Sequence, residues 1–162
     1  MGIRKLVLVA TLLFASAPQA ARAEVGVGVF GGEPTGLDVK LDIARRSALD
    51  IVLGYYSHWR DYGLDGAYGH LTYLVQPLVA HGDSVLVPLR LGIGVAIFDQ
   101  AGKFDDDIDL AARVPFEIGF RFRRTPLEIY LEVALKVTFL DGEPYRHDRV
   151  DLDGGLGLRF YF

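Results

Sequence analysis

The 162-residue sequence contains no cysteine, and it has only one methionine, one tryptophan and four histidines. The lack of cysteine excludes a disulfide framework, a thiolate zinc site and a cysteine nucleophile. Basic residues are also few, because 17 lysines and arginines face 21 aspartates and glutamates, which gives a net charge of −4. The mature chain is acidic and lacks the basic footprint, a Lys/Arg cluster on one element, that nucleic-acid binding needs, so we expect no nucleic-acid partner.

The apolar content is high, since 51% of the residues are hydrophobic and 12% are aromatic. This composition excludes a disordered tail, and the length fits a single domain.

Residues 1–23 have the pattern of a signal peptide. Arg4 and Lys5 precede an almost wholly apolar run from Leu6 to Ala17, and Ala21-Arg22-Ala23 matches a small-x-small cleavage site. The run is too short to span a membrane. Cleavage after Ala23 removes three bases and no acid, which leaves 139 residues with a net charge of −7. We therefore expect export, with residues 1–23 as a cleaved signal peptide and residues 24–162 as one domain.

Apolar and polar residues alternate with period two through most of residues 24–162, which is the pattern of β-strands with two different faces. Between positions 85 and 97, for example, every second residue is a valine, leucine or isoleucine. The alternation predicts eight strands, at residues 24–30, 36–42, 48–58, 66–75, 85–97, 110–122, 127–139 and 150–162. Turn-forming residues separate them, at 31–35, 45–47, 59–65, 77–84, 98–109, 123–126 and 141–149.

The volume of the two faces decides which one points inward. An eight-stranded barrel encloses on the order of a dozen side chains, whereas the apolar faces of these segments carry roughly forty mostly large residues. The opposite faces mix small residues with charges of both signs, and buried charges are tolerated when they are paired. We therefore predict a lumen charge network formed by Asp38, Lys40, Asp42, Asp50, Arg90, Arg113, Glu117, Arg121, Glu128, Glu132, Lys136, Asp151, Asp153 and Arg159.

An apolar exterior around a charged interior describes a barrel in lipid, where closure satisfies every backbone hydrogen-bonding group. The predicted fold class is all-β, an eight-stranded antiparallel up-and-down transmembrane β-barrel over residues 24–162. Eight strands close on their own side chains, so we expect a plugged lumen with negligible conductance. Two rims carry the aromatic residues expected of girdles, namely Tyr55 and Phe139 on one rim and Tyr73, Phe120, Phe122, Phe160 and Phe162 on the other.

Two prolines interrupt the predicted strands. Pro88 and Pro115 each lack the N–H that would donate to the ladder, so each needs a bulge or a position without a backbone hydrogen bond.

The C-terminal residues from Leu156 to Phe162 alternate apolar and polar residues and end in phenylalanine. This ending resembles the C-terminal insertion signature of outer-membrane proteins, here Leu158, Phe160, Tyr161 and Phe162. Together with the eight-strand count, it makes the chain resemble the OmpA/OmpX-like small outer-membrane barrels. The resemblance implies insertion from the periplasm by the barrel-assembly machinery and a structural, adhesive or surface-binding role.

Signals of catalysis are weak. Residues 26–31 match G-x-G-x-x-G, but a turn and another strand follow in place of a helix, so no phosphate cradle forms. His70 and Thr72 are the nearest match to a His-x-Ser pair, and we expect both to point into the lumen, away from any acyl chain. The acidic segment from Asp99 to Asp109 matches no EF-hand, and we expect it to be a solvated loop. We predict no catalytic residue, no metal site and no cofactor.

These features predict a monomeric integral protein in the outer membrane of a Gram-negative-type bacterium, surrounded by outer-membrane lipids and with a structural or surface-interaction role. Two alternatives remain open. One is a lipid-modifying outer-membrane enzyme, and the other is a soluble periplasmic lipocalin-like binding barrel, in which the apolar faces would form the core.

Overall fold

The computed structural model describes residues 24–56, 66–99, 108–140 and 150–162, and these form eight strands. The strands are β1 (Val25–Glu33), β2 (Thr35–Ala44), β3 (Ser47–Tyr56), β4 (Gly66–His81), β5 (Val85–Asp99), β6 (Ile108–Phe122), β7 (Leu127–Leu140) and β8 (Val150–Tyr161). Within the described ranges, no helix is long and apolar enough to cross a membrane.

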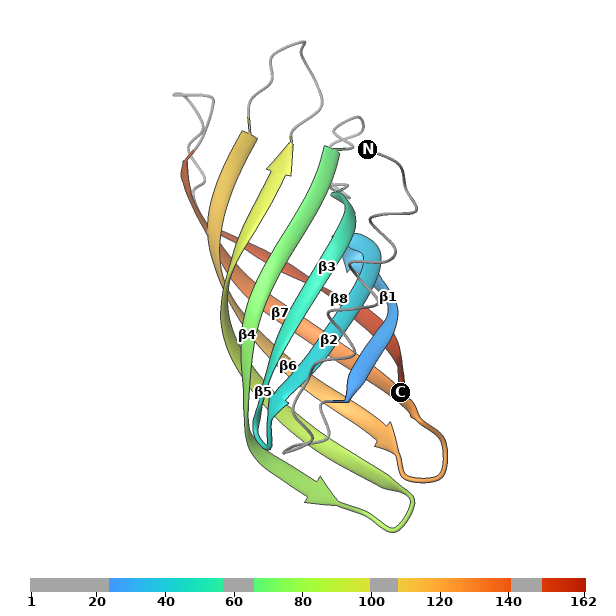
Figure 1. The fold of residues 1–162 in the computed structure, drawn as a ribbon. Helices are drawn as coiled ribbons and strands as arrows, with labels where there is room; N and C mark the ends of the chain where they lie inside the picture. The colour runs from blue at the N-terminus through green and yellow to red at the C-terminus, as the bar shows by residue number, and fades with distance from the viewer. Residues whose placement is uncertain (1–23, 57–65, 100–107, 141–149) are drawn as a thin grey trace.

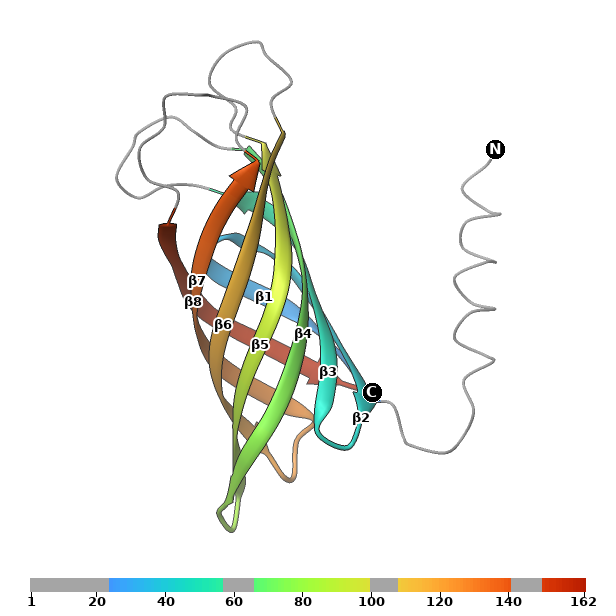
Figure 2. The ribbon, with the colours of Figure 1, turned by 90° about the vertical axis from the view of Figure 1, so that its left-hand side faces the viewer.

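Each strand pairs with the next strand along the chain, and β8 pairs antiparallel with β1 to close the barrel. The closing pair runs from Gly26 opposite Tyr161 to Glu33 opposite Gly154. The strands are inclined around a common axis, as Figures 1 and 2 show. The predicted fold class, an eight-stranded antiparallel up-and-down barrel, is therefore confirmed.

The outer surface of the barrel is apolar on every strand. Large side chains such as Leu37, Ile93 and Leu152 are 64% to 66% exposed, and they alternate with buried residues on the same strands. Contiguous apolar patches on soluble monomers rarely exceed a few hundred Å². An apolar surface that surrounds the whole barrel is that of a transmembrane barrel, whose exterior contacts lipid. The aromatic residues predicted for the two rims are all exposed on this surface.

The two ends of the barrel differ in their connections. We call one of them the turn end, because the β2–β3, β4–β5 and β6–β7 turns lie there, beside the start of β1 and the end of β8 (Figures 1 and 2). At the opposite end, the loop end, β1 and β2 meet at Pro34. The other loop-end connections, at 57–65, 100–107 and 141–149, lie outside the described residues, as does the predicted signal peptide.

Two of the predicted turns are largely strand. The segment 77–84 was expected to be a turn, but β4 continues to His81 and only residues 82–84 connect it to β5. The pairing shifts by one residue between Val75 and Leu78, which lets β4 pass Pro77 and pair again with β5. Likewise, residues 31–33 of the expected 31–35 turn belong to β1, because they pair with β8.

The mid-strand prolines are accommodated without a bulge between β5 and β6. Pairing is interrupted opposite both prolines and resumes in the same register on either side. Each proline faces a glycine of the other strand: a Cβ on Gly119 would lie 3.0 Å from the Cγ of Pro88, and a Cβ on Gly92 would lie 2.9 Å from the Cγ of Pro115. Because the β5–β6 pairing is interrupted at the prolines and its register does not shift, the prolines occupy positions without a backbone hydrogen bond between these strands and need no bulge there.

Candidate functional site

The interior of the barrel holds a network of buried charges centred on Arg159. Strand β8 places this guanidinium inside the barrel, where it is fully buried and donates hydrogen bonds to three carboxylates. The distances are 2.6 Å to Asp38, 2.7 Å to Asp50 and 2.9 Å to Glu117. These acids come from β2, β3 and β6, so a single arginine connects four strands across the lumen.

Arg90 extends the same layer toward the turn end. Its guanidinium forms ion pairs with Glu117 and Glu128, and Nη2 lies 3.0 Å from Oε2 of Glu128. The Tyr161 hydroxyl donates a hydrogen bond of 2.9 Å to the same Glu128 carboxylate. Because Glu117 contacts both Arg90 and Arg159, the two arginines share one continuous cluster, which we call the Arg159 layer: Asp38, Asp50, Arg90, Glu117, Glu128 and Arg159.

Tyr130 completes the Arg159 layer with a ring and a hydroxyl. The hydroxyl donates a 2.5 Å hydrogen bond to Asp38, and the Cζ of Arg159 lies 3.6 Å from the ring centroid. The ring occupies the space over Gly157, the residue opposite it on β8, where an added Cβ would lie 2.0 Å from the ring. A side chain at position 157 would therefore displace the Tyr130 ring from this position.

A second cluster lies around Arg113. Its guanidinium donates hydrogen bonds of 2.6 Å to Glu132 and 3.1 Å to Thr72, and Nη1 lies 2.9 Å from Nε2 of His70. His70 in turn lies 3.3 Å from the Tyr68 hydroxyl through Nδ1 and 3.5 Å from Asp50 through Nε2. The cluster thus links β3, β4, β6 and β7, and His70 connects it to the Arg159 layer.

Lys136 forms a third group. Its Nζ lies 3.0 Å from Asp153 and 3.4 Å from Asp151, and 5.0 Å from the centroid of the Phe98 ring. Phe98 packs with Tyr68, Ala96 and Ala111 in a small buried apolar cluster. Together with the two arginine clusters, this group places paired charges and packed rings in the interior of the barrel.

Most residues of the predicted lumen charge network lie in this interior. Buried are Asp38, Lys40, Asp50, Arg90, Arg113, Glu117, Glu128, Glu132, Lys136, Asp153 and Arg159. Three others are partly exposed: the side chains of Asp42, Arg121 and Asp151 are 24%, 23% and 42% exposed. Asp42 pairs with Lys40, and Arg121 lies 2.6 Å from Glu24. These residues sit near strand ends, where the same alternation continues but the barrel opens.

Two tyrosines in the interior were not predicted as partners of the polar network: Tyr68 contacts His70, and Tyr130 donates to Asp38. Thr72 points into the lumen as expected, and Asp109 is buried at the start of β6 although it was expected in a loop. The alternation of faces along each strand could have identified the two tyrosines, because Tyr68 lies on the same face as His70 and Tyr130 on the same face as Glu128 and Glu132. Side chains with a hydroxyl on an inward face are the natural donors for an excess of carboxylates.

The residues predicted to form the C-terminal insertion signature alternate as expected. Leu158, Phe160 and Phe162 are 41%, 44% and 81% exposed on the outer surface, whereas Tyr161 is buried in the lumen. The backbone N–H of Phe162 donates to the carbonyl of Val25 at 3.0 Å, which holds the end of the chain beside β1.

The described residues offer no obvious catalytic or metal site. His70 and Thr72 both point into the packed interior. Among the residues that the structure describes, no group of three or more His, Asp or Glu side chains is arranged to hold a metal ion. Asp105, Asp106 and Asp107 of the predicted acidic loop lie outside the described residues.

The architecture defines a small transmembrane β-barrel, and a solved structure shares this fold. The N-terminal β-barrel domain of OprF from Pseudomonas aeruginosa superposes with a TM-score of 0.61 at 13% sequence identity, over 86% of this chain and 96% of that domain. Ail, the attachment invasion locus protein of Yersinia pestis, aligns over 88% of this chain and 100% of that chain at 13% identity with a TM-score of 0.40. The superposition on the OprF barrel domain confirms the resemblance to small outer-membrane barrels for the fold.

No protein-family model matches the sequence, and no curated protein matches it significantly.

Proposed function

We propose that this protein is a monomeric integral protein of the outer membrane of a Gram-negative-type bacterium, with a structural or surface-interaction role and no enzymatic activity. The signal-peptide pattern of residues 1–23 supports export, and the C-terminal alternation supports insertion by the barrel-assembly machinery. The fold shared with the OprF barrel domain supports the outer membrane as the destination.

One observation carries the proposal: the two surfaces of the barrel are inverted relative to a soluble protein. Apolar side chains cover the outside of all eight strands, and eleven residues of the predicted charge network are buried inside. A lipocalin-like barrel needs the opposite arrangement, with an apolar interior that holds a ligand. In water, this barrel would expose its apolar exterior and bury its charges, and both arrangements cost free energy. The apolar exterior therefore favours a barrel in lipid over the soluble alternative.

The filled lumen argues against a transport role. Arg159 is fully buried and reaches acids on β2, β3 and β6, and Arg113 is fully buried between Glu132 on β7 and Thr72 on β4, so paired side chains occupy the interior in two clusters. An eight-stranded barrel has an interior that its own side chains fill. In a planar bilayer, the purified protein is expected to give no step-like ion current, and currents that disappear in an Arg113→Met or Glu132→Gln variant would contradict a closed lumen.

The alternative of a lipid-modifying enzyme lacks an accessible reaction centre in the described residues. A barrel that acts on an acyl chain must present its nucleophile or base to the bilayer. His70 is 4% exposed and contacts Arg113, Tyr68 and Asp50 inside the barrel. Its position supports a role in the internal polar network.

Fractionation and gel mobility test the proposal directly. A closed, lipid-facing barrel resists SDS and migrates compactly until it is heated, so we expect the protein in the outer-membrane fraction and a shift in mobility on boiling. Recovery in the soluble periplasmic fraction with no heat-dependent shift would overturn the proposal and support the soluble lipocalin-like alternative.

A further inference from the structure

A cavity of about 190 Å³ opens at the turn end of the barrel. Its walls come from the start of β1, from β2 and β3 with the turn between them, and from facing parts of β4, β5 and β6. Five basic side chains line it, but only two acidic ones: Lys40, Arg45, Arg46, Arg90 and Arg121 against Glu24 and Asp42. The cavity is therefore electropositive, although the whole protein is acidic.

The two acids are already neutralised by bases of the cavity. Glu24 lies 2.6 Å from Arg121, and Asp42 pairs with Lys40. Arg90 is neutralised from the other side, by Glu117 and Glu128 of the lumen. Among the described residues, the positive charges of Arg45 and Arg46 therefore have no acidic partner.

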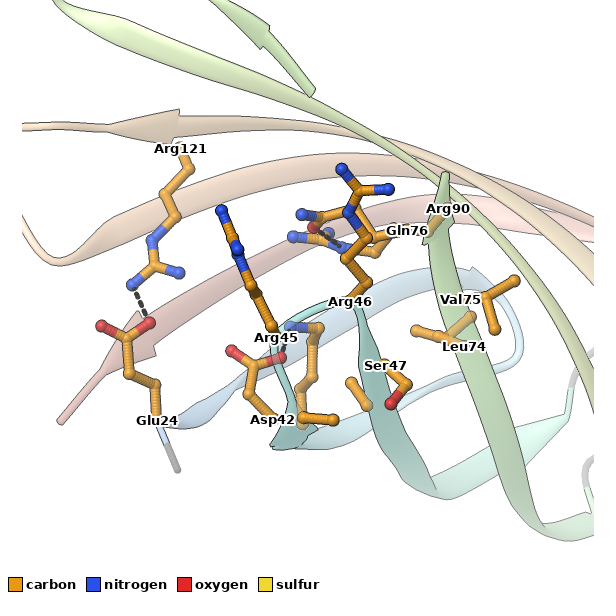
Figure 3. A pocket seen from close by; sticks show the side chains of 13 residues that line it. Glu24, Asp42, Arg45, Arg46, Ser47, Leu74, Val75, Gln76, Arg90 and Arg121 are labelled. Atoms are coloured by element: carbon orange, nitrogen blue, oxygen red, sulfur yellow. Dashed lines mark hydrogen bonds and ion pairs between the residues drawn. The ribbon is translucent and has the colours of Figure 1, made fainter. Parts of the chain in front are cut away.

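Arg45 and Arg46 form the tip of the β2–β3 turn. Among the residues that the structure describes, neither guanidinium makes a hydrogen bond or an ion pair. Figure 3 shows both side chains extending from the turn toward the side of the cavity where Arg121 and Arg90 lie. The backbone beneath them is held in place, because the N–H of Gln76 on β4 donates a 2.8 Å hydrogen bond to the carbonyl of Arg46.

We propose that this cavity binds a phosphate-bearing anion, with Arg45 and Arg46 as its principal ligands. Two adjacent guanidinium forks on a fixed turn present paired N–H donors that match phosphate oxygens. A water molecule takes up about 30 Å³ in the liquid, so the volume of about 190 Å³ accommodates a phosphate with a group of glycerol size attached. This inference goes beyond a structural role for the barrel.

The surroundings of the cavity fit a phosphate at a lipid surface. Val75 lines the cavity and is also 40% exposed on the apolar exterior, and Ile43, two residues before Arg45, is 48% exposed. Tyr73 lies on the same rim. An acyl chain in contact with these side chains would bring its phosphate to Arg45 and Arg46, whereas a soluble phosphate would enter from the aqueous side of the turn.

A titration of the folded barrel separates these sources. We would prepare the ¹⁵N-labelled mature protein in dodecyl maltoside, a detergent without phosphate. At constant ionic strength, we would record the amide signals of residues 45–47 and 121 and the Nε–H signals of Arg45, Arg46 and Arg121. One arm adds glycerol phosphate. The other adds phosphatidylglycerol to the micelles, with diacylglycerol as the lipid without a phosphate. A heat-dependent gel shift on every sample shows that the barrel is closed.

The test variant is Arg45→Gln with Arg46→Gln, and the charge-matched control is Arg123→Gln with Arg124→Gln. The control removes two exposed arginines from the β6–β7 turn at the same end, outside the cavity. We expect saturable shifts at residues 45–47, an affinity at least tenfold weaker in the test variant, and no comparable loss in the control. Saturation by phosphatidylglycerol alone assigns the site to a lipid headgroup, and saturation by glycerol phosphate as well assigns it to a soluble phosphate.

Two results would overturn the proposal while the gel shift is retained. The first is the absence of saturable shifts with either phosphate compound. The second is equal weakening in the test and control variants, which would mean that the anion responds to the general charge of this end and not to the cavity.

Discussion

Arg159 and Arg113 are both fully buried, yet they are held in different ways. Arg159 donates hydrogen bonds to three carboxylates from three strands, whereas Arg113 contacts one carboxylate, one imidazole and one hydroxyl. In the Arg159 layer, four acids share two arginines, and the hydroxyls of Tyr130 and Tyr161 supply further donors. Both arginines bridge strands, but Arg159 is paired with several carboxylates, whereas Arg113 is paired with one carboxylate and two neutral groups.

This difference has a physical consequence for stability. A buried charge that loses its only partner is strongly destabilising, and the penalty grows with the number of charges left unpaired. Removing Arg159 affects Asp38, Asp50 and Glu117 together, whereas removing Arg113 leaves only Glu132 without a cation. We therefore expect the same substitution to lower the free energy of unfolding by different amounts at the two arginines.

The largest effect is expected for Arg159→Met. The substitution keeps side-chain volume but leaves three carboxylates short of a donor, so the free energy of unfolding should fall by about 3–5 kcal/mol or more. Urea unfolding in lipid vesicles, followed by tryptophan fluorescence and by heat-shifted gel mobility, measures the loss. Arg124→Gln, an exposed arginine at the turn end, serves as the control and should change the stability by no more than about 0.5 kcal/mol. Equal stability of the two variants would show that the Arg159 layer does not hold the barrel together.

A smaller effect is expected for Arg113→Met, because only the Glu132 carboxylate loses its cation. We expect a loss of about 2–3 kcal/mol in the same unfolding measurement. Adding Glu132→Gln to this variant should restore most of the loss, since the amide carries no charge to leave unpaired. In the Arg159 layer, no single acid substitution should restore Arg159→Met to the same extent, because two other carboxylates remain. A full rescue of Arg159→Met by Asp38→Asn alone would contradict the distinction between the clusters.

The contrast between the clusters also shows how far the sequence determines the interior. Period-two alternation predicts which side chains point inward, and eleven residues of the predicted charge network are buried, whereas Asp109 was expected in a loop. The alternation does not predict the height of these side chains along the barrel axis, which depends on the stagger of the closed sheet. The contact between Arg159 and Asp38 joins residues 121 positions apart and exists only because β8 closes on β1.

The pairing shifts add to this limit. Between Asp42 and Ala44, between Val75 and Leu78, and between Leu110 and Ala111, the register moves relative to the neighbouring strand. Each shift changes which residues face each other beyond it, and no local pattern in the sequence marks these positions except Pro77. For this reason the extent of β4 was underestimated, and the partners within the lumen were predicted as a set and not as individual pairs.

The smallest effect is expected for Tyr130→Phe, which tests the hydroxyl donors that distinguish the Arg159 layer. The phenyl ring keeps its contacts with Arg159 and Gly157, and only the hydrogen bond to Asp38 is lost. A hydrogen bond to a charged acceptor contributes about 1.5 kcal/mol, so this is the expected loss in the free energy of unfolding. The matched control is Tyr73→Phe, because Tyr73 is 42% exposed on the outer surface and its substitution should leave the barrel unchanged. If both variants unfold at the same urea concentration, the tyrosine donor is dispensable, and the excess of carboxylates around Arg159 must be balanced by the two arginines alone.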